Sequence, residues 1–249
     1  MLSVIIITKN EAHNIAECLD SVAWADEVIV MDSGSTDDTV SICKSRNVKV
    51  VETDWPGFGP QKNRALALAQ GEWVLSIDAD ERVTEELRLE IQATLTNSSH
   101  YDAYKIPRSS SYCGKFMRHS GWWPDHVTRL FRRASAKFTD DAIHEKLLVD
   151  ESKLGTLKQA LIHYSFMNAD DVLRKINAYS SIRANRDHTD GKRASLSKAL
   201  FHGIWAFFKT YIIKLGFLDG KKGLMLAISN AEGSYYRYIK LMLLAEKQA

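Results

Sequence analysis

The sequence predicts an α/β protein: a mostly parallel, doubly wound sheet flanked by helices, followed by a C-terminal helical amphipathic appendage. Three observations support this prediction. Strand-like runs rich in Val and Ile alternate with helix-like segments through the N-terminal third of the chain. The first run, 3–8, is continuously apolar and β-branched, which is typical of a strand buried on both faces of a parallel sheet. From residue 169 onward the pattern is helical.

The N-terminal elements follow a regular order. Four strands are expected, at 3–8, 27–32, 48–52 and 73–77. Helices are expected at about 15–22, from Ser35 onward, at 63–70 and at 84–95, with a loop at 55–60. Ser35 is the expected N-cap of the second helix, with Asp38 three positions on. This β-α repeat predicts right-handed crossovers and a parallel sheet.

The rhythm changes after residue 95. Strand-like segments at 101–107 and 127–132 have no long helix between them, so a mixed or antiparallel edge region is expected. The segment 108–126 is expected to be a loop, in which Trp122 and Trp123 either form a platform for a ligand or anchor the loop. The predicted domains are 1–168 and 169–249.

Composition excludes several classes of protein. The 249 residues are 45% hydrophobic and 26% charged, which is ordinary globular make-up and not that of a disordered, collagenous or disulfide-stapled chain. Cys18, Cys43 and Cys113 lack the spacing of a zinc or redox motif, so buried free thiols are expected. The apolar run at 2–8 is too short for a signal peptide, and a cytoplasmic location is expected.

The net charge of +2 conceals an asymmetry. From Val172 onward there are 14 Lys and Arg residues against 5 Asp and Glu, a balance of +9, whereas the first 171 residues carry 19 against 26, a balance of −7. A basic tail on an acidic body indicates an anionic partner for the tail, either a membrane surface or nucleic acid.

Polar side chains follow three of the predicted strands. In open parallel sheets, ligands bind outside the carboxyl ends of the strands. The chain places there Thr8, Asn10, Glu11, Asp32, Ser33, Gly34, Asp78 and Asp80. No G-x-G-x-x-G follows the first strand, which disfavours a dehydrogenase, and the absence of a G-x-x-x-x-G-K-[ST] motif excludes a P-loop NTPase.

The segment Asp78-Ala79-Asp80 predicts a metal site. Two carboxylates at i and i+2 where a strand ends can both turn toward one hard divalent cation, Mg²⁺ or Mn²⁺. Such an ion would stabilise the charge that develops on a departing diphosphate. The alternative is a solvated loop.

A series of short motifs then points to one family. They occur in order over residues 1 to about 85: Thr8-Lys-Asn-Glu11, Glu27-Val-Ile-Val-Met-Asp32-Ser-Gly-Ser-Thr-Asp37, Gln61-Lys-Asn-Arg64, Gly71-Glu-Trp73 and Asp78-Ala-Asp80. Together they resemble the family 2 inverting glycosyltransferases of the GT-A fold, a Rossmann-like α/β fold.

The resemblance implies a UDP-sugar donor and assigns its site. The implied donor-binding residues are Thr8, Asn10, Glu11, Asp32, Gln61, Lys62, Asp78 and Ala79. Asp32 would accept a hydrogen bond from the uracil imide. Asp78 would face the ribose or the metal, and Asp80 would be the principal metal ligand.

Further motifs resemble one branch of that family. They are Gly121-Trp-Trp-Pro124, Arg129-Leu-Phe-Arg132, Ile143-His-Glu145 and Gly216-Phe-Leu-Asp-Gly220. Members of that branch are β-1,4-glucosyltransferases of the lipopolysaccharide inner core in Gram-negative bacteria. The resemblance implies transfer of glucose from UDP-glucose to an inner-core sugar, heptose, on a lipid-linked saccharide.

An inverting transferase needs one general base to take the proton of the acceptor hydroxyl. The candidates are Asp140, Asp141 and Glu145, with Glu145 preferred and Asp141 second. His144-Glu145 replaces the family's usual Glu-Asp pair, and Glu145 alternatively only decorates a helix start. His163 is expected as a late metal ligand, the alternative being a histidine bonded to backbone.

The basic tail is expected to bind a membrane surface. In 196–218 large apolar residues recur at helical spacing, with Lys198, His202 and Lys209 on the other side. Internal basic groups and Gly203 argue against a spanning helix, so a helix in the membrane interface is expected, on the cytoplasmic face of the inner membrane. The alternative is that its apolar face packs on the catalytic domain. No nucleic-acid-binding motif accompanies the basic residues, and the sequence leaves the number of subunits open.

Two rival functions belong to other classes. A sugar-phosphate nucleotidyltransferase shares the parallel-sheet nucleotide site, but it needs a glycine-rich basic loop where this chain has Asn10-Glu11-Ala-His-Asn14. A non-catalytic module that binds sugar nucleotides or lipid would not need metal carboxylates and a base together.

Overall fold

The computed structural model describes residues 1–46, 48–96, 100–140 and 145–246. The chain divides into two compact units, which are considered separately. Unit 1 consists of Met1–Arg108 and His126–His163, and unit 2 of Ser109–Asp125 and Tyr164–Ala249. The sequence-based division assigns catalysis to residues 1–168 and membrane binding to residues 169–249, and these two roles stay predictions.

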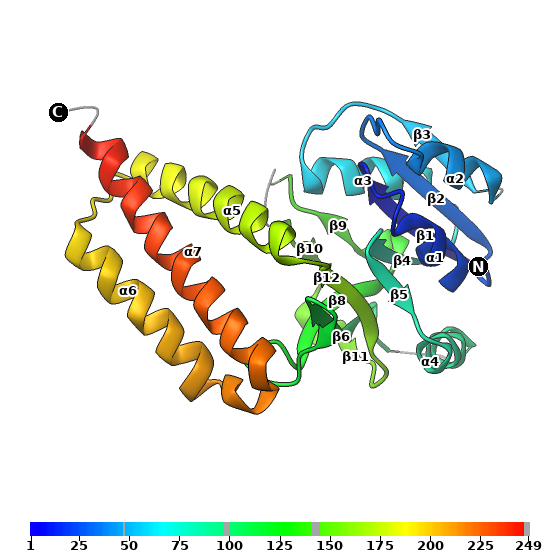
Figure 1. Cartoon of the computed structure of the whole chain (residues 1–249). Helices are drawn as coiled ribbons and strands as arrows, with labels where there is room; N and C mark the ends of the chain where they lie inside the picture. Colours follow the sequence, from blue (N-terminus) through cyan, green and yellow to red (C-terminus); the bar gives the residue numbers. More distant parts are fainter. Residues whose placement is uncertain (47, 97–99, 141–144, 247–249) are drawn as a thin grey trace. The chain divides into compact units, whose positions relative to one another are not determined.

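The central sheet carries the parallel core that the sequence predicts (Figure 1). Four adjacent strands run parallel in the order β3 (Lys49–Glu52), β2 (Glu27–Asp32), β1 (Leu2–Thr8) and β4 (Trp73–Asp78). Every residue of β1 is buried, as expected of a strand covered on both faces. The β1–β2 register places Thr8 beside Asp32, so both strands deliver their last residues to one edge.

Beyond β4 the sheet becomes mixed, as predicted. The strand order continues through β8, β6, β12 and β5, and β8 pairs antiparallel with β4. These strands are β5 (Glu81–Val83), β6 (Ala103–Tyr112), β8 (Asp125–Arg132) and β12 (Leu161–Phe166), with β11 (Leu154–Thr156) alongside β6. A separate two-stranded sheet pairs β9 (Lys137–Phe138) with β10 (Leu147–Leu148), and short 3-10 turns lie at Arg133–Ser135 and Glu151–Lys153.

Helices cover both faces of the parallel strands. They are α1 (Ile15–Ser21), α2 (Thr39–Ser45), α3 (Phe58–Leu68) and α4 (Glu85–Thr96). Because side chains alternate along a strand, Val4 and Ile6 pack in the cluster that contains residues of α1 and α4, whereas Ile5 packs in the one that contains residues of α3.

Three local expectations were wrong. The second helix begins at Thr39 and not at Ser35, because the Ser35 hydroxyl is bonded to Asp32. α3 begins at Phe58, inside the expected loop 55–60. The expected loop 108–126 is partly a hairpin, because β6 extends to Tyr112 and pairs with β7 (Lys115–Phe116).

Unit 2 is mainly helical. α7 (Gly220–Glu246) lies alongside both α5 (Ala169–Thr189) and α6 (Leu196–Phe208) (Figure 1). A π-helical turn at Lys209–Ile213 and a 3-10 turn at Gly216–Asp219 connect α6 to α7. Gly223 allows this connection, because a Cβ there would lie 1.8 Å from the Gly216 carbonyl oxygen.

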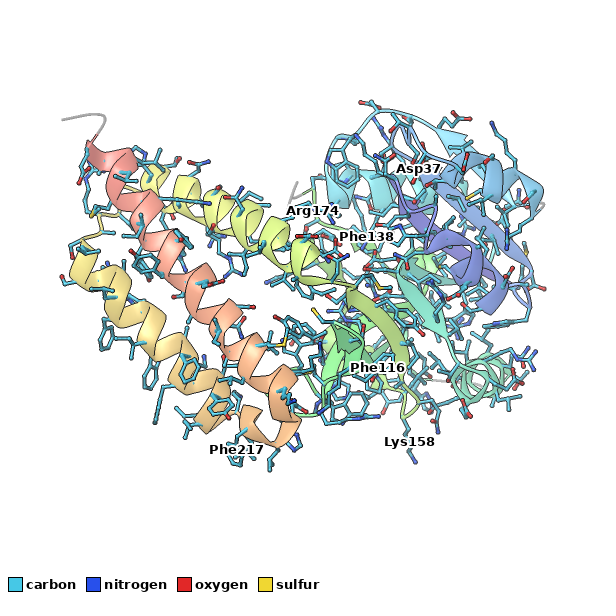
Figure 2. All side chains as sticks on the ribbon, viewed as in Figure 1. Asp37, Phe116, Phe138, Lys158, Arg174 and Phe217 are labelled. Atoms are coloured by element: carbon cyan, nitrogen blue, oxygen red, sulfur yellow. The ribbon has the colours of Figure 1, made fainter. Side chains whose placement is uncertain are left out.

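α6 is amphipathic in the sense that the sequence predicts. Ala199 and Gly203 are buried, and Gly203 lies against Tyr235 of α7. On the outer side, Ile204 is 71% exposed and Phe201 66% exposed. Figure 2 shows the side chains of this outer side projecting away from α7. Phe217, at the turn between the two helices, is exposed as well. Among the described helices, none is long and apolar enough to cross a bilayer.

Candidate active site

The loops after β1 and β2 are tied together by the predicted nucleotide-binding residues. Asp32 is almost fully buried and accepts hydrogen bonds from the backbone of Gly34 and Ser35, at 2.9 and 2.8 Å, and from the Ser35 hydroxyl. Asn10 accepts from the Thr36 backbone at 2.7 Å, and its own backbone N–H donates to Ser35. Asp32 and Asn10 therefore hold the second loop in a fixed conformation.

Glu11 and Gln61 brace the same edge. The Glu11 backbone donates to the Thr39 hydroxyl at 2.8 Å, and its carboxylate accepts from Asn14 at 2.8 Å. Gln61 is fully buried on α3 and donates to the Ser33 hydroxyl at 2.9 Å. Both side chains thus support the loops that surround the expected nucleotide.

Thr8 carries an unsatisfied polar atom at this edge. Its Oγ1 is buried, and within the described parts of the chain it has no hydrogen-bond partner. A buried hydroxyl without a partner is costly unless a ligand or water completes its bonding. A polar ligand at the end of β1 would satisfy it.

The first carboxylate of the D-x-D segment lies in a chain of buried charges. Asp78 Oδ2 is 2.5 Å from Arg129 Nη2, and Asp78 Oδ1 is 3.2 Å from Lys62 Nζ. Arg129 also donates to Glu81 at 2.7 Å, and Glu81 is fully buried. Lys62 continues the chain to Glu145, whose Oε1 lies 2.7 Å from Lys62 Nζ.

This arrangement perturbs two pKa values. Burial alone would raise the pKa of Asp78, but the charges of Arg129 and Lys62 and the hydrogen bonds they donate outweigh burial and hold it well below its usual range. Burial would lower the pKa of Arg129, but Asp78 and Glu81 raise it. Asp78 is therefore a carboxylate whose two oxygens are both already engaged.

The second carboxylate of the segment faces the predicted histidine. Asp80 Oδ2 lies 3.3 Å from His163 Nε2. The antiparallel pairing of β12 with β5 places His163 opposite Glu81, the residue after Asp80. Both residues are predicted metal ligands, and the pairing of β12 with β5 brings them together.

Asp80 and His163 fit a divalent cation. Two ligand atoms about 2.1 Å from one ion and at right angles lie roughly 3.0 Å apart, close to the observed separation. Among the described residues, no group of three or more His, Cys, Asp or Glu side chains is placed to hold an ion. A cation here would take its remaining ligands from water and from substrate phosphates, as Mg²⁺ commonly does.

The candidate bases are placed differently. Glu145 is mostly buried, with 18% of its side chain exposed, and is bonded to Lys62. Asp140 is exposed and bonded to Asn63 at 3.4 Å. Asp141, the second choice, lies outside the described residues. Ala79 is buried and its carbonyl oxygen accepts from Arg82 at 2.9 Å.

Sequence reasoning missed the roles of Arg129 and Glu81. Neither residue was assigned a place in the site, although Arg129 is 7% exposed and bonds both Asp78 and Glu81. Two signals were available for Arg129: it belongs to the motif Arg129-Leu-Phe-Arg132, and it stands in a strand-like apolar run, where an unpaired charge is disfavoured. Lys62 links Asp78 to Glu145, and its expected contact with the donor stays a prediction.

Comparisons with known proteins agree with this architecture. The mixed α/β fold is that of GT-A glycosyltransferases: a structure of Staphylococcus aureus TarS 1-349 with UDP-GlcNAc has a TM-score of 0.51 at 18% identity, over 99% of this chain and 92% of that one. The sequence matches the family described as Glycosyl transferase family 2 over residues 3–151. The chain belongs to this family and is a transferase.

Two relatives align with nearly the whole chain. An uncharacterised glycosyltransferase of Rickettsia prowazekii, RP128, is 34% identical over 257 residues, which cover 99% of this chain and 88% of the relative. The lipopolysaccharide core biosynthesis glycosyltransferase LpsC of Rhizobium meliloti is 27% identical over 95% of this chain and 93% of the relative. The similarity therefore extends into the helical unit as well.

Proposed function

We propose that this protein is a metal-dependent inverting glycosyltransferase that moves glucose from UDP-glucose to a heptose of the lipopolysaccharide inner core. The observation that supports it most is the Lys62 bridge, which holds the candidate base Glu145 next to the D-x-D segment. The similarity to LpsC, named for lipopolysaccharide core biosynthesis, supports the acceptor class.

The donor nucleotide would lie at the carboxyl edge of β1 and β2. The Thr8 hydroxyl and the backbone at Ala79 would bond its polar groups, beside the loop that Asp32 and Asn10 hold in shape. Because both Asp32 oxygens already accept bonds from its own turn, a uracil imide at Asp32 would share an acceptor with Ser35.

The leaving diphosphate would be bound at the end of β4. Asp80 and His163 would hold a Mg²⁺ or Mn²⁺ ion, which supplies stabilisation of the charge that develops on the diphosphate. Arg129 and Lys62 bond Asp78, and they fix its orientation toward the ribose side of the donor.

Glu145 would act as the general base. Lys62 holds Oε1, and among the described residues no donor is bonded to Oε2, so that oxygen can accept the proton of the acceptor hydroxyl. The hydroxyl oxygen would then attack C1 of the sugar from the face opposite the diphosphate, which inverts the configuration. A departing nucleoside diphosphate needs no acid to protonate it.

We further propose that the outer side of α6 binds the surface of an anionic membrane, which would place the enzyme peripherally on the cytoplasmic face of the inner membrane. Large apolar side chains are exposed along it: Leu200, Phe201, Ile204, Trp205 and Phe208, and Ile212 is exposed in the π-helical turn that follows. The exposed Lys221 lies at the start of α7. Apolar residues beside lysines suit an interfacial helix on anionic lipid.

Release of UDP tests the proposed activity. The purified chain would be incubated with a panel of UDP-sugars, Mg²⁺ or Mn²⁺, and deacylated inner-core saccharide with exposed heptose. We expect UDP release that needs both UDP-glucose and the saccharide. Equal release without acceptor would indicate hydrolysis, and release of pyrophosphate from a nucleoside triphosphate with sugar phosphate would support a nucleotidyltransferase instead.

A further inference from the structure

The helical unit contains a cavity of about 590 Å³ that is formed entirely by residues of unit 2. One wall comes from α5 and another from the polar side of α7. The π-helical turn, the segment around Trp122, Ala206 of α6 and Phe166 of β12 form the rest. Volumes of this size are typical of sites that take a small organic ligand. None of the nucleotide-site residues lines it.

The charged side chains that line the cavity are all positive. Five basic residues line it, and no Asp or Glu does. Two of the five are engaged: Arg237 bonds Asp187 at 2.7 Å, and Lys175 donates to the Ser165 carbonyl at 2.7 Å. The other three are Arg183, Lys209 and Lys214, and within the described parts of the chain none of these three has an ion-pair partner. The cavity therefore carries uncompensated positive charge.

The π-helical turn brings two of these charges together. Residues five apart in an α-helix lie about 140° apart around the axis and point to different sides. Here the Lys214 backbone N–H donates to the Lys209 carbonyl at 2.9 Å, an i→i+5 bond, and both lysines line the cavity. π-helical turns are rare in proteins, and those that do occur are often found at functional sites.

The surrounding backbone accommodates Lys214. A Cβ at Gly121 would lie 3.5 Å from its Cγ, and the Ser120 backbone N–H donates to its carbonyl oxygen at 2.7 Å. Ser120 is itself held by Asp219, which is 2% exposed and also accepts from the backbone of His119. The backbone at Lys214 is therefore fixed by its hydrogen bond with Ser120.

The cavity also has polar side chains and an aromatic wall. Ser229, Asn230 and Ser234 line it from α7. Each already makes one hydrogen bond, to Tyr112, Thr210 and His202 respectively, and each keeps an oxygen that can accept from a ligand hydroxyl. Trp122 lines it, and its ring is fixed against Tyr112 and Phe166 at centroid distances of 5.9 Å. Hydroxyls and amides suit sugar oxygens, and the face of an aromatic ring suits the apolar face of a sugar ring.

We propose that this cavity is a second ligand site, which binds the phosphate monoester group of a phosphorylated saccharide. Arg183, Lys209 and Lys214 would bind the phosphate oxygens, because charge-assisted hydrogen bonds from Arg and Lys match a phosphate dianion. Trp122 and the polar residues of α7 would contact the sugar ring. The cavity shares no lining residue with the proposed donor site, and the proposal does not depend on the transfer reaction.

Titration calorimetry on the full chain tests the proposal with three probes: inorganic phosphate, glucose 6-phosphate and dihexanoyl phosphatidic acid. Unphosphorylated glucose is the control ligand. We expect glucose 6-phosphate to bind most tightly, and binding to weaken as ionic strength rises. Tighter binding of the phosphatidic acid would overturn the saccharide assignment in favour of a lipid headgroup.

The variants locate the binding. The triple variant R183Q/K209Q/K214Q should bind glucose 6-phosphate at least about tenfold more weakly. The matched control R186Q/R193Q/K221Q removes three exposed charges of the same unit that do not line the cavity, and it should bind as the unmodified chain does. The single variant K214Q keeps the proposal testable if the triple variant does not fold. It should bind glucose 6-phosphate several-fold more weakly than the unmodified chain.

Three results would overturn the proposal: no binding of any phosphate probe, equal weakening in the triple and control variants, or full displacement of glucose 6-phosphate by UDP. The last would assign the binding to the donor site. Retention of UDP binding in the triple variant is expected, because none of the three residues lies at the donor site.

Discussion

Lys62 joins the candidate base to the D-x-D segment: its Nζ lies 2.7 Å from Glu145 Oε1 and 3.2 Å from Asp78 Oδ1. Lys62 and Glu145 are 83 residues apart in the sequence. The side chain of Lys62 is only 4% exposed, so its charge must be balanced locally, and the two carboxylates balance it. The orientation of Glu145 is thereby coupled to that of Asp78.

Substitution E145Q should lower turnover by about 100-fold or more, because glutamine keeps the shape of the side chain but cannot accept a proton as a base. Donor binding should be unchanged. Steady-state UDP release and UDP titration would measure both. The control E151Q alters an exposed carboxylate that is not a candidate base, and it should leave turnover near normal. Near-normal turnover of E145Q would transfer the role to Asp141.

Substitution D80N should raise the concentration of Mg²⁺ or Mn²⁺ needed for half-maximal activity, because it removes one negative oxygen from the expected ion. H163A should act in the same direction, since Asp80 and His163 face each other. Activity measured over a metal titration would show the shift. Full activity of the unmodified chain in excess chelator would contradict the metal role.

Substitution R129M should lower the free energy of unfolding by about 3–5 kcal/mol, because it leaves Glu81 buried without its closest cation and removes one partner of Asp78. Urea unfolding would measure the loss. The control R88M breaks a surface pair with Glu85, which is worth about 0–1 kcal/mol. Equal losses in the two variants would show that the buried charges contribute little.

Acid should weaken the helical unit through Asp187. Burial would raise the pKa of Asp187, but hydrogen bonds from Lys192 and Arg237 outweigh burial and hold it below its usual value. A carboxyl whose folded pKa is depressed stabilises the fold above its unfolded pKa of about 3.9, and that contribution is lost as pH falls through the folded pKa. Asp190 also forms an ion pair with Lys192, so it faces the same cation as Asp187.

The comparison is between the unmodified chain and D187N. We expect D187N to melt at a lower temperature at pH 6, with the difference shrinking as pH falls below about 4. Thermal melts monitored by circular dichroism over pH 3–6 would measure it. A difference that stays constant across this range would contradict an ionised, stabilising Asp187.

Substitution F201S/I204S should reduce binding to vesicles that contain anionic lipid, because it removes two of the most exposed apolar side chains of α6. Co-sedimentation with phosphatidylglycerol vesicles would measure the loss. The control L89S alters an exposed leucine of α4, which is 54% exposed, and should bind normally. Unchanged binding of F201S/I204S would refute α6 as the membrane-binding surface.

Local patterns in the sequence were sufficient to predict the parallel core. The β-branched run of β1, the acids after β2 and β4, and the spacing of Asp78 and Asp80 are all local patterns, and local patterns follow from the periodicity of strands and helices. The motif order over the first third of the chain was sufficient to indicate the family to which the chain belongs.

Local patterns failed where side chains compete for partners. Ser35 was expected to begin a helix, but its hydroxyl bonds Asp32 instead and the helix begins at Thr39. The apolar spacing in 196–218 indicated a helix, but it could not reveal the π-helical turn that begins at Lys209. Both outcomes depend on which neighbour a polar group meets.

The pairing of the buried charges depends instead on how distant segments pack together. Arg129 reaches Asp78 because β8 pairs with β4, and His163 reaches Asp80 because β12 pairs with β5. Lys62 reaches Glu145 from α3. A buried charge is stable only beside an opposite charge. Because that partner is chosen by strand pairing between distant segments, no local pattern in the sequence could name it.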